Sequence, residues 1–227
     1  MTTITLRESR SLGMAFTVAC LILSVSLASG VEPYFPVKSK RGEPGLRAYN
    51  AEWCGLVLHR MEEPRLAQMA TNESAIVYRF TIIPTWGNDI SIRIQSEGNV
   101  FRLCGKRLDG RGGFDPGKLV ERKEFVLSEQ ESTEILVCLK SLNFFEMNTE
   151  DLPSGCDGEE WILEGVRDGK YHVVTRWSAN APEFDPDKRG LQAFVKFCSL
   201  LVDQASLTQR PKNKGHELIP PRSSVPH

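Results

Sequence analysis

The sequence has few of the residues and spacings that would identify a metal or redox site. It has 227 residues with only four histidines, and neither an HExxH motif nor a CxxC pair occurs. Zinc and dithiol sites ordinarily use such spacings. The acidic stretch at 151–160 also lacks the D-x-D-x-D-G spacing of a calcium loop. We therefore expect no cofactor and no metal ion.

An excess of charge is also missing. The chain carries 28 basic and 29 acidic residues, which leaves a net charge of −1. This balance gives no electrostatic reason to expect nucleic acid or an anionic membrane as the partner. The apolar content of 41% is that of a globular protein.

No complete catalytic motif is present. The stretch GGFDPGK (112–118) matches the start of a phosphate-binding loop, but Leu119 stands where that motif needs Ser or Thr to bind magnesium. Its glycines are better explained by tight turns. No G-x-S-x-G motif occurs. Cys156 is the one cysteine in a polar loop, where a thiol and a histidine base could form a nucleophilic pair.

Residues 1–30 have the order of a secretory signal peptide. Arg7 and Arg10 precede an apolar run at 13–28, and small residues follow it. The run is shorter than the roughly 20 residues that span a bilayer. We therefore expect cleavage, export to the periplasm or the outside, and no permanent membrane span. The alternative is a lipoprotein attached through Cys20, or another N-terminal anchor.

Five cysteines remain after such cleavage. Because the number is odd, at least one stays unpaired, and their mostly apolar neighbours favour free buried thiols. One disulfide stays open, since an exported protein meets an oxidising compartment. The five are Cys54, Cys104, Cys138, Cys156 and Cys198.

Hydrophobic periodicity predicts a single domain over 48–205. A proline-rich linker (31–47) precedes it, and a tail without periodic apolar residues (206–227), expected to be disordered, follows it. Alternating apolar and polar residues predict strands near 75–83, 89–96, 100–108, 119–127, 161–167 and 170–177.

Helix-start signals place three helices around these strands. Asn50 is a candidate N-cap for the first, Ser128 and Glu131 form a capping box for the second, and Asp185 with Pro186 starts the third. The order is therefore α-ββββ-α-ββ-α. Short turns between the strands predict an α+β fold, with an antiparallel sheet of about six strands and the helices packed on one face.

The stretch WILEGVRDGKYHVVTRW (161–177) predicts a hairpin that turns at its Asp-Gly dipeptide, because both turn positions need positive φ. Cross-strand partners share a face. The register therefore places Gly165 beside His172 and Trp161 beside Arg176. The glycine leaves open space next to the histidine, and the arginine suits a cation–π contact with the tryptophan.

This face of the hairpin is the candidate binding site. With two nearby carboxylates it would form an anion- or peptide-binding surface, made of Trp161, His172, Arg176, Glu160 and Asp157. The structural alternative is that the histidine is hydrogen-bonded across the sheet. The arginine would then pair with a carboxylate such as Glu160 or Asp157.

Two motifs, CDGEEWILEG (156–165) and YHVVTRWS (171–178), carry a resemblance to a family of uncharacterised, small, exported bacterial proteins. The resemblance extends from about residue 50 to 201. It implies a shared fold, and because the family has no established activity it assigns no catalytic residue. Family members often have proline where this chain has Ala179, and other residues at several of the cysteine positions.

The absence of a catalytic motif favours an exported, non-catalytic protein that binds a protein or peptide of the cell envelope. The alternative is a hydrolase of envelope material, with His172 as base and Asp157 or Glu160 nearby. The two hypotheses differ in geometry. The enzyme needs His172 in a cleft with those carboxylates or with Cys156.

Overall fold

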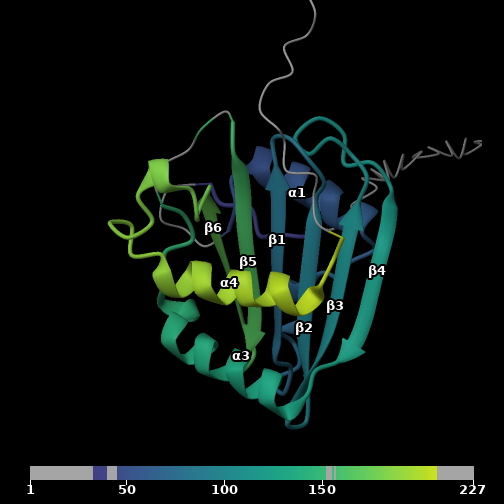
Figure 1. Cartoon of the computed structure of the whole chain (residues 1–227), viewed down its shortest axis with the longest axis vertical. Helices are drawn as coiled ribbons and strands as arrows, with labels where there is room; N and C mark the ends of the chain where they lie inside the picture. Colours follow the sequence, from purple (N-terminus) through teal and green to yellow (C-terminus); the bar gives the residue numbers. More distant parts are fainter. Residues whose placement is uncertain (1–32, 40–44, 152–154, 156, 209–227) are drawn as a thin grey trace, which may run out of the picture. The chain divides into compact units, whose positions relative to one another are not determined.

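The computed structural model describes residues 33–39, 45–151, 155 and 157–208. Within them lies a six-stranded antiparallel sheet with the strand order β4-β3-β2-β1-β5-β6 (Figure 1). The strands are β1 (Val77–Pro84), β2 (Ile90–Glu97), β3 (Val100–Leu108), β4 (Leu119–Val126), β5 (Glu159–Arg167) and β6 (Lys170–Trp177). The helices are α1 (Ala48–Arg60), α2 (Leu66–Met69), α3 (Glu129–Leu142) and α4 (Gln192–Ala205), with 3-10 turns η1 (Phe144–Glu146) and η2 (Pro182–Phe184). The α+β class and the order α-ββββ-α-ββ-α are confirmed, with α2 as a short addition.

Local chemistry accounts for the start of α3 and for the last hairpin. The amide of Ser128 donates to Glu131 Oε2 (2.7 Å), and the amide of Glu131 donates to Ser128 Oγ (3.2 Å), so the predicted capping box forms. The β5–β6 turn has Asp168 and Gly169 at φ 54° and 69°. The predicted register of this hairpin is confirmed along its length.

The starts of the other two long helices differ from the prediction. Arg47 occupies the N-cap position of α1, so Asn50 lies inside the helix and is not its cap. α4 begins at Gln192 and not at the Asp-Pro pair. Asp185 and Gly190 have positive φ (47° and 66°), and this backbone conformation interrupts a right-handed helix between them.

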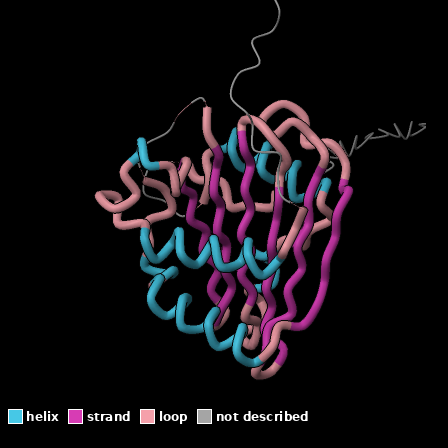
Figure 2. The backbone as a smooth tube through the Cα atoms, viewed as in Figure 1, coloured by secondary structure: helices cyan, strands magenta, loops and turns pink. Residues whose placement is uncertain are grey.

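Helices cover both faces of the sheet, which corrects the expectation that they pack on one face. α3 and α4 cross one face, and α1 lies behind the other (Figure 1, Figure 2). Tyr78, Phe80 and Ile82 of β1 pack with α3 and α4, whereas Ile83 and, on β5, Ile162 pack with α1. Every residue of β1 is buried. The centre of the sheet therefore has two buried faces.

Part of the segment predicted to be a linker belongs to the core on the α1 side. Phe35 and Leu46 are 1% and 0% exposed, and both pack against α1. The amide of Leu46 donates to Pro36 O and the amide of Lys38 to Leu46 O, both at 2.9 Å. The stretch around residues 36–38 therefore pairs with Leu46, and both pack beside α1.

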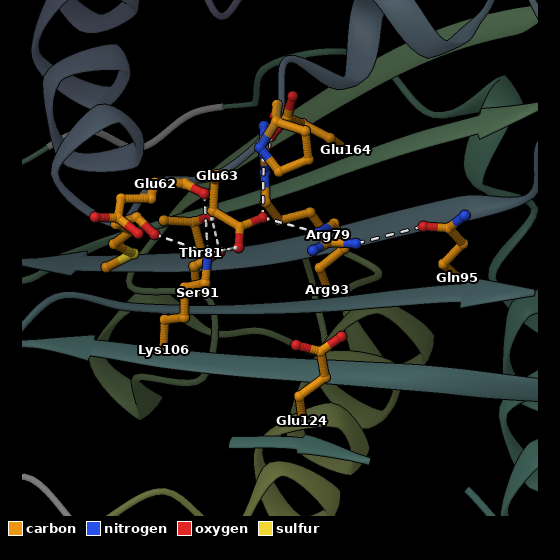
Figure 3. A network of polar contacts seen from close by, with 12 residues as sticks. Glu62, Glu63, Arg79, Thr81, Ser91, Arg93, Gln95, Lys106, Glu124 and Glu164 are labelled. Carbon is orange, nitrogen blue, oxygen red and sulfur yellow. Dashed lines mark hydrogen bonds and ion pairs between the residues drawn. The ribbon is translucent and has the colours of Figure 1, made fainter. Parts of the chain in front are cut away.

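Buried charged residues make the face of the sheet that α1 covers hard to recognise in the sequence. Glu63, in the connection between α1 and α2, has no exposed side-chain surface. It lies 2.8 Å from Lys106 Nζ, 3.0 Å from Arg93 Nε and 3.5 Å from Arg79 Nη1 (Figure 3). Burial by itself would raise the pKa of Glu63, but the three cations outweigh it and hold the pKa below its usual value. One carboxylate thus ties this connection to β1, β2 and β3.

Arg79 extends the same cluster to β5. Its Nε and Nη2 donate to Glu164 Oε2 at 2.7 and 2.5 Å, and its Nη1 donates to the carbonyl of Pro64 at 2.6 Å. Tyr171 donates to the other oxygen of Glu164 at 2.9 Å. Burial would lower the pKa of Arg79, but Glu164 and Glu63 raise the pKa by more than burial lowers it. The guanidinium therefore keeps its charge. We call Glu63, Arg79, Arg93, Lys106 and Glu164 the buried charge cluster.

Of the helices in the described part of the chain, none is long and apolar enough to cross a membrane. The predicted signal peptide (1–30) lies outside the described residues, as does the tail from residue 209 on. At the start of the predicted tail, Leu207 packs against the core on the α4 side, and the amide of Thr208 donates to Glu121.

Candidate functional site

The predicted site on the last hairpin is divided between the two faces of the sheet. Trp161, His172 and Arg176 lie on the face that α3 and α4 cover, because their cross-strand pairs are those expected. Glu160 is paired with Trp177 and therefore lies on the α1 face. The five candidate residues do not form a single surface.

His172 is enclosed by η1. Its Nε2 lies 2.8 Å from the carbonyl oxygen of Met147, and its ring packs against Phe144 at 5.1 Å between centroids. The space expected beside Gly165 is filled, since a Cβ there would lie 2.6 Å from Phe144 and 2.8 Å from Tyr78. Burial lowers the pKa of His172 below its usual value, although its contact with the Met147 carbonyl opposes this. The ring is therefore neutral near pH 7.

Arg176 holds the segment after η1 against β6. It is 4% exposed and donates to the carbonyls of Asn148 (2.9 Å) and Thr149 (3.2 Å). Its charge is paired with Asp151 at 3.6 Å, not with Glu160 or Asp157 as the structural alternative suggested. Its cation–π contact is with Phe194 of α4 and not with the cross-strand tryptophan.

Trp161 is a core residue and not a surface anchor. It is 3% exposed, and its ring packs at 5.0 Å from Phe80 and 6.3 Å from Phe194. Its indole N–H donates to Glu159. Trp161, His172 and Arg176 therefore have packing and hydrogen-bonding roles on this face, although the partners of the histidine and the arginine differ from those that the structural alternative named.

A hollow of about 500 Å³ lies on the α1 side of the sheet, beside Glu160. Its walls come from the start of α1, the ends of β1, β5 and β6, the β3–β4 loop, and Glu150, Asp151 and Gly155. We call it the Glu160 pocket. The aromatic and charged side chains that line it are Tyr49, Trp53, Phe114, Trp177, Arg47, Glu150, Asp151 and Glu160.

Two of the three carboxylates in the Glu160 pocket have cationic partners. Glu150 Oε2 lies 2.5 Å from Lys38 Nζ and 3.8 Å from Arg47 Nε. Asp151 accepts two hydrogen bonds from Arg189, at 3.0 and 3.1 Å. These pairs also fix the segment before residue 152 against the rest of the domain.

Glu160 is different, because no ion pair joins it to a lysine or arginine in the described part of the chain. Burial raises its pKa to about 7. A hydrogen bond with Thr175 opposes that rise, Glu150 and Asp151 add to it, and the charge of Arg176 opposes it. Glu160 therefore changes its charge close to neutral pH.

An aromatic pair borders the Glu160 pocket and points into solvent. Trp86 and Phe114 are 56% and 65% exposed, and their ring centroids are 5.2 Å apart. Phe114 lines the pocket, and the indole N–H of Trp86 donates to Asp157 Oδ1 at 3.3 Å. We call Trp86 and Phe114 the aromatic rim. Asp157 is thus the predicted residue that reaches this rim.

The loops that carry the aromatic rim are locked together. Gly112 has φ 57°, and a Cβ at this position would collide with the carbonyl oxygen of Pro84. The side chain of Asn88 donates to Gly110 O at 3.1 Å. The stretch that resembles a phosphate-binding loop is therefore a tight connection between β3 and β4, and Leu119 is the first residue of β4.

The proposed catalytic pair of His172 with Glu160 does not form. His172 and Glu160 lie on opposite faces of the sheet, and His172 is packed beneath η1. Cys156 lies outside the described residues. Cys54, Cys104, Cys138 and Cys198 are buried free thiols, and the described residues contain no cluster suited to a metal ion.

Sequence reasoning identified Glu160 and Asp157 but missed the aromatic side chains around them. The hairpin register already implied that Glu160 and Trp177 are partners. Nothing in the sequence indicated that Trp53 on α1 and Phe114 on the β3–β4 loop would meet them. Those contacts depend on α1 covering the second face of the sheet.

No family model matches the chain, and neither does any curated protein or solved structure. The resemblance to an exported bacterial family therefore stays a prediction.

Proposed function

We propose that this is an exported, non-catalytic binding protein, and that the Glu160 pocket with its aromatic rim contacts a protein or peptide of the cell envelope. The observation that carries the proposal is the position of Trp86 and Phe114, two exposed aromatic side chains beside a hollow. Exposed tryptophan and phenylalanine are typical anchors of binding surfaces.

Rigid loops support the same proposal. A side chain that is already fixed loses less conformational entropy when a partner binds. The contacts of Gly112 with Pro84 and of Asn88 with Gly110 hold both loops before binding. Export rests on the signal-like residues 1–30, and the net charge of −1 argues against nucleic acid.

Removing the aromatic rim tests this function. The variant Trp86→Ser/Phe114→Ser should lose the partner in cross-linking capture from envelope extract, followed by binding of the purified partner. A matched control is Leu136→Ser/Val137→Ser on α3, which removes two apolar side chains that are 50% and 62% exposed and do not line the pocket. The control should bind the partner as the wild type does.

Equal capture by the wild type and by the folded rim variant would contradict the proposed site. Circular dichroism must first show that both double variants keep the wild-type fold. Loss of capture by both double variants would also count against the rim, because it would indicate general sensitivity to surface changes.

A second function is favoured by one observation, the pKa of about 7 at Glu160. A general acid works best when its pKa is near the working pH, so Glu160 could donate a proton during hydrolysis of envelope material. This hydrolase would not use His172. Screening envelope glycans and peptides with the wild type and with Glu160→Gln tests it. Turnover that is equal in the two proteins would rule out this role.

A further inference from the structure

The charges around the Glu160 pocket indicate what kind of group it binds, given the binding function proposed above. Among the described residues that line the pocket, three are carboxylates and the one cation is Arg47, whose side chain is 72% exposed. The other cations that pair with Glu150 and Asp151 lie outside this lining; they are Lys38, Arg176 and Arg189. The pocket surface is therefore predominantly anionic.

Glu160 is the lining carboxylate that a cation would stabilise most. An ionised carboxylate that is largely removed from water and has no counter-ion is unfavourable. Glu150 and Asp151 already have cations within ion-pair distance, whereas Glu160 has a hydrogen bond with the neutral Thr175. A positively charged group that enters the pocket would supply the missing partner.

The walls of the pocket suit the same kind of ligand. Tyr49, Trp53, Phe114 and Trp177 all line it. Aromatic faces attract ammonium and guanidinium groups through the negative potential above the ring. A volume of about 500 Å³ accommodates a long side chain, and it is within the usual range for small-ligand sites.

We infer that the Glu160 pocket binds the ammonium or guanidinium group of a lysine or arginine side chain of the partner, in an ion pair with Glu160. The aromatic rim then contacts the neighbouring part of the partner chain. Because the ion pair needs the carboxylate form, a proton bound to Glu160 passes to solvent when the ligand enters.

The inference predicts a pH dependence. With a pKa of about 7, Glu160 is mostly ionised at pH 8 and mostly protonated at pH 6, so affinity should be about tenfold weaker at pH 6. The described ionisable groups that line the pocket with Glu160 or interact with it are Arg47, Tyr49 and Cys54 of the α1 region, Glu150, Asp151 and Arg176. None of them is a histidine, the residue type that ordinarily titrates in this interval.

The test uses the purified chain and three small amides as probes. Nα-acetyl-lysine amide carries the ammonium group, Nα-acetyl-norleucine amide has the same chain without charge, and Nα-acetyl-glutamate amide carries the opposite charge. Binding is followed by the NMR signals of the indole N–H groups of Trp53 and Trp177. We expect saturable shifts with the lysine amide alone, with affinity about tenfold weaker at pH 6 than at pH 8.

Variants then assign the effect to Glu160. Glu160→Gln should weaken binding of the lysine amide and remove the pH dependence. Glu183→Gln should change neither, because Glu183 is an exposed carboxylate outside the pocket lining. The pH dependence of the wild type is informative by itself, so the test does not depend on the stability of a variant.

Three results would overturn the inference: equal affinity for the norleucine amide, preference for the glutamate amide, or no saturable shift with any probe. These results differ from failure of the proposed function. If the rim variant loses its partner but the pocket shows no preference for lysine, the binding site stands and the cation inference falls. If the lysine preference is found but the rim variant keeps its partner, the inference stands and the rim is not the contact surface.

Discussion

Replacing Arg79 by methionine tests the buried charge cluster. The side chain of Arg79 has no exposed surface, and it donates three hydrogen bonds of 2.5 to 2.7 Å to Glu164 and to the carbonyl of Pro64. Methionine leaves Glu164 buried without its cation and takes one of three cations from Glu63. Removing one partner of a buried ion pair costs about 3–5 kcal/mol.

Thermal unfolding followed by near-ultraviolet circular dichroism measures this loss. For a domain of this size, 1 kcal/mol shifts Tm by about 2–4 °C, so Arg79→Met should lower Tm by roughly 6–20 °C. Arg102→Met is the matched control, because Arg102 pairs with Glu97 at 2.6 Å on the surface, where both side chains are 41% exposed. Its unfolding curve should lie close to that of the wild type.

A second variant separates the charge from the packing. Arg79→Met/Glu164→Met removes the stranded carboxylate together with its partner, so it should be more stable than Arg79→Met alone. A Tm for Arg79→Met close to that of Arg102→Met would refute the reasoning. A double variant that is less stable than the single one would also refute it, since loss of packing would then dominate.

Three further predictions concern the site and the hairpin. Because burial raises the pKa of Glu160 from 4.5 to about 7, this group favours the folded state fully below about pH 4.5 and loses that contribution as the pH rises through 7. The stability of Glu160→Gln relative to the wild type should therefore rise by about 3 kcal/mol between pH 4.5 and 8 in urea unfolding, and a constant difference would contradict the shift. His172→Ala should lose about 1–3 kcal/mol of stability, because the contact with Met147 disappears. The variant should still capture the partner. Loss of capture by the folded variant would restore His172 as a binding residue. Gly112→Ala, which forces the loop away from Pro84, should lose about 1–3 kcal/mol and weaken partner binding, and unchanged binding would show that loop rigidity is not required.

Features of the fold that depend on neighbouring residues could be predicted from the sequence. The capping box of Ser128 and Glu131 and the register of the last hairpin each follow from a few adjacent positions. The start of α4 could not be predicted in this way. Asp185 and Gly190 themselves have positive φ, and this conformation overrides the Asp-Pro helix signal.

The second buried face was hidden for a physical reason. Arg79, Lys106 and Glu164 are charged residues of a kind that usually faces solvent, yet they are buried, because Arg79 is paired with Glu164 and Lys106 with Glu63. The segment with Phe35 and Leu46 contains prolines and basic residues, which are typical of a linker, although these two side chains complete the α1 core.

Only part of the candidate site could be predicted from the sequence. Glu160 and Asp157 could be named because they directly precede the predicted hairpin in the chain. Trp53, Phe114 and Trp86 come from three other segments, which meet there only in the folded chain. The residues His172 and Arg176 were recognised as unusual within a sheet, but their polar groups bind the segment after η1.

The titration of the Glu160 carboxyl group tests the central claim about the pocket most directly. The chain is labelled with ¹³C at its glutamate side-chain carboxyl groups, and the Glu160 signal is assigned by its loss in Glu160→Gln. We expect a midpoint near pH 7 in the free protein, and a lower midpoint when Nα-acetyl-lysine amide is added. A midpoint near 4.5 that does not move with the amide would contradict both the uncompensated carboxylate and its role in binding a cation.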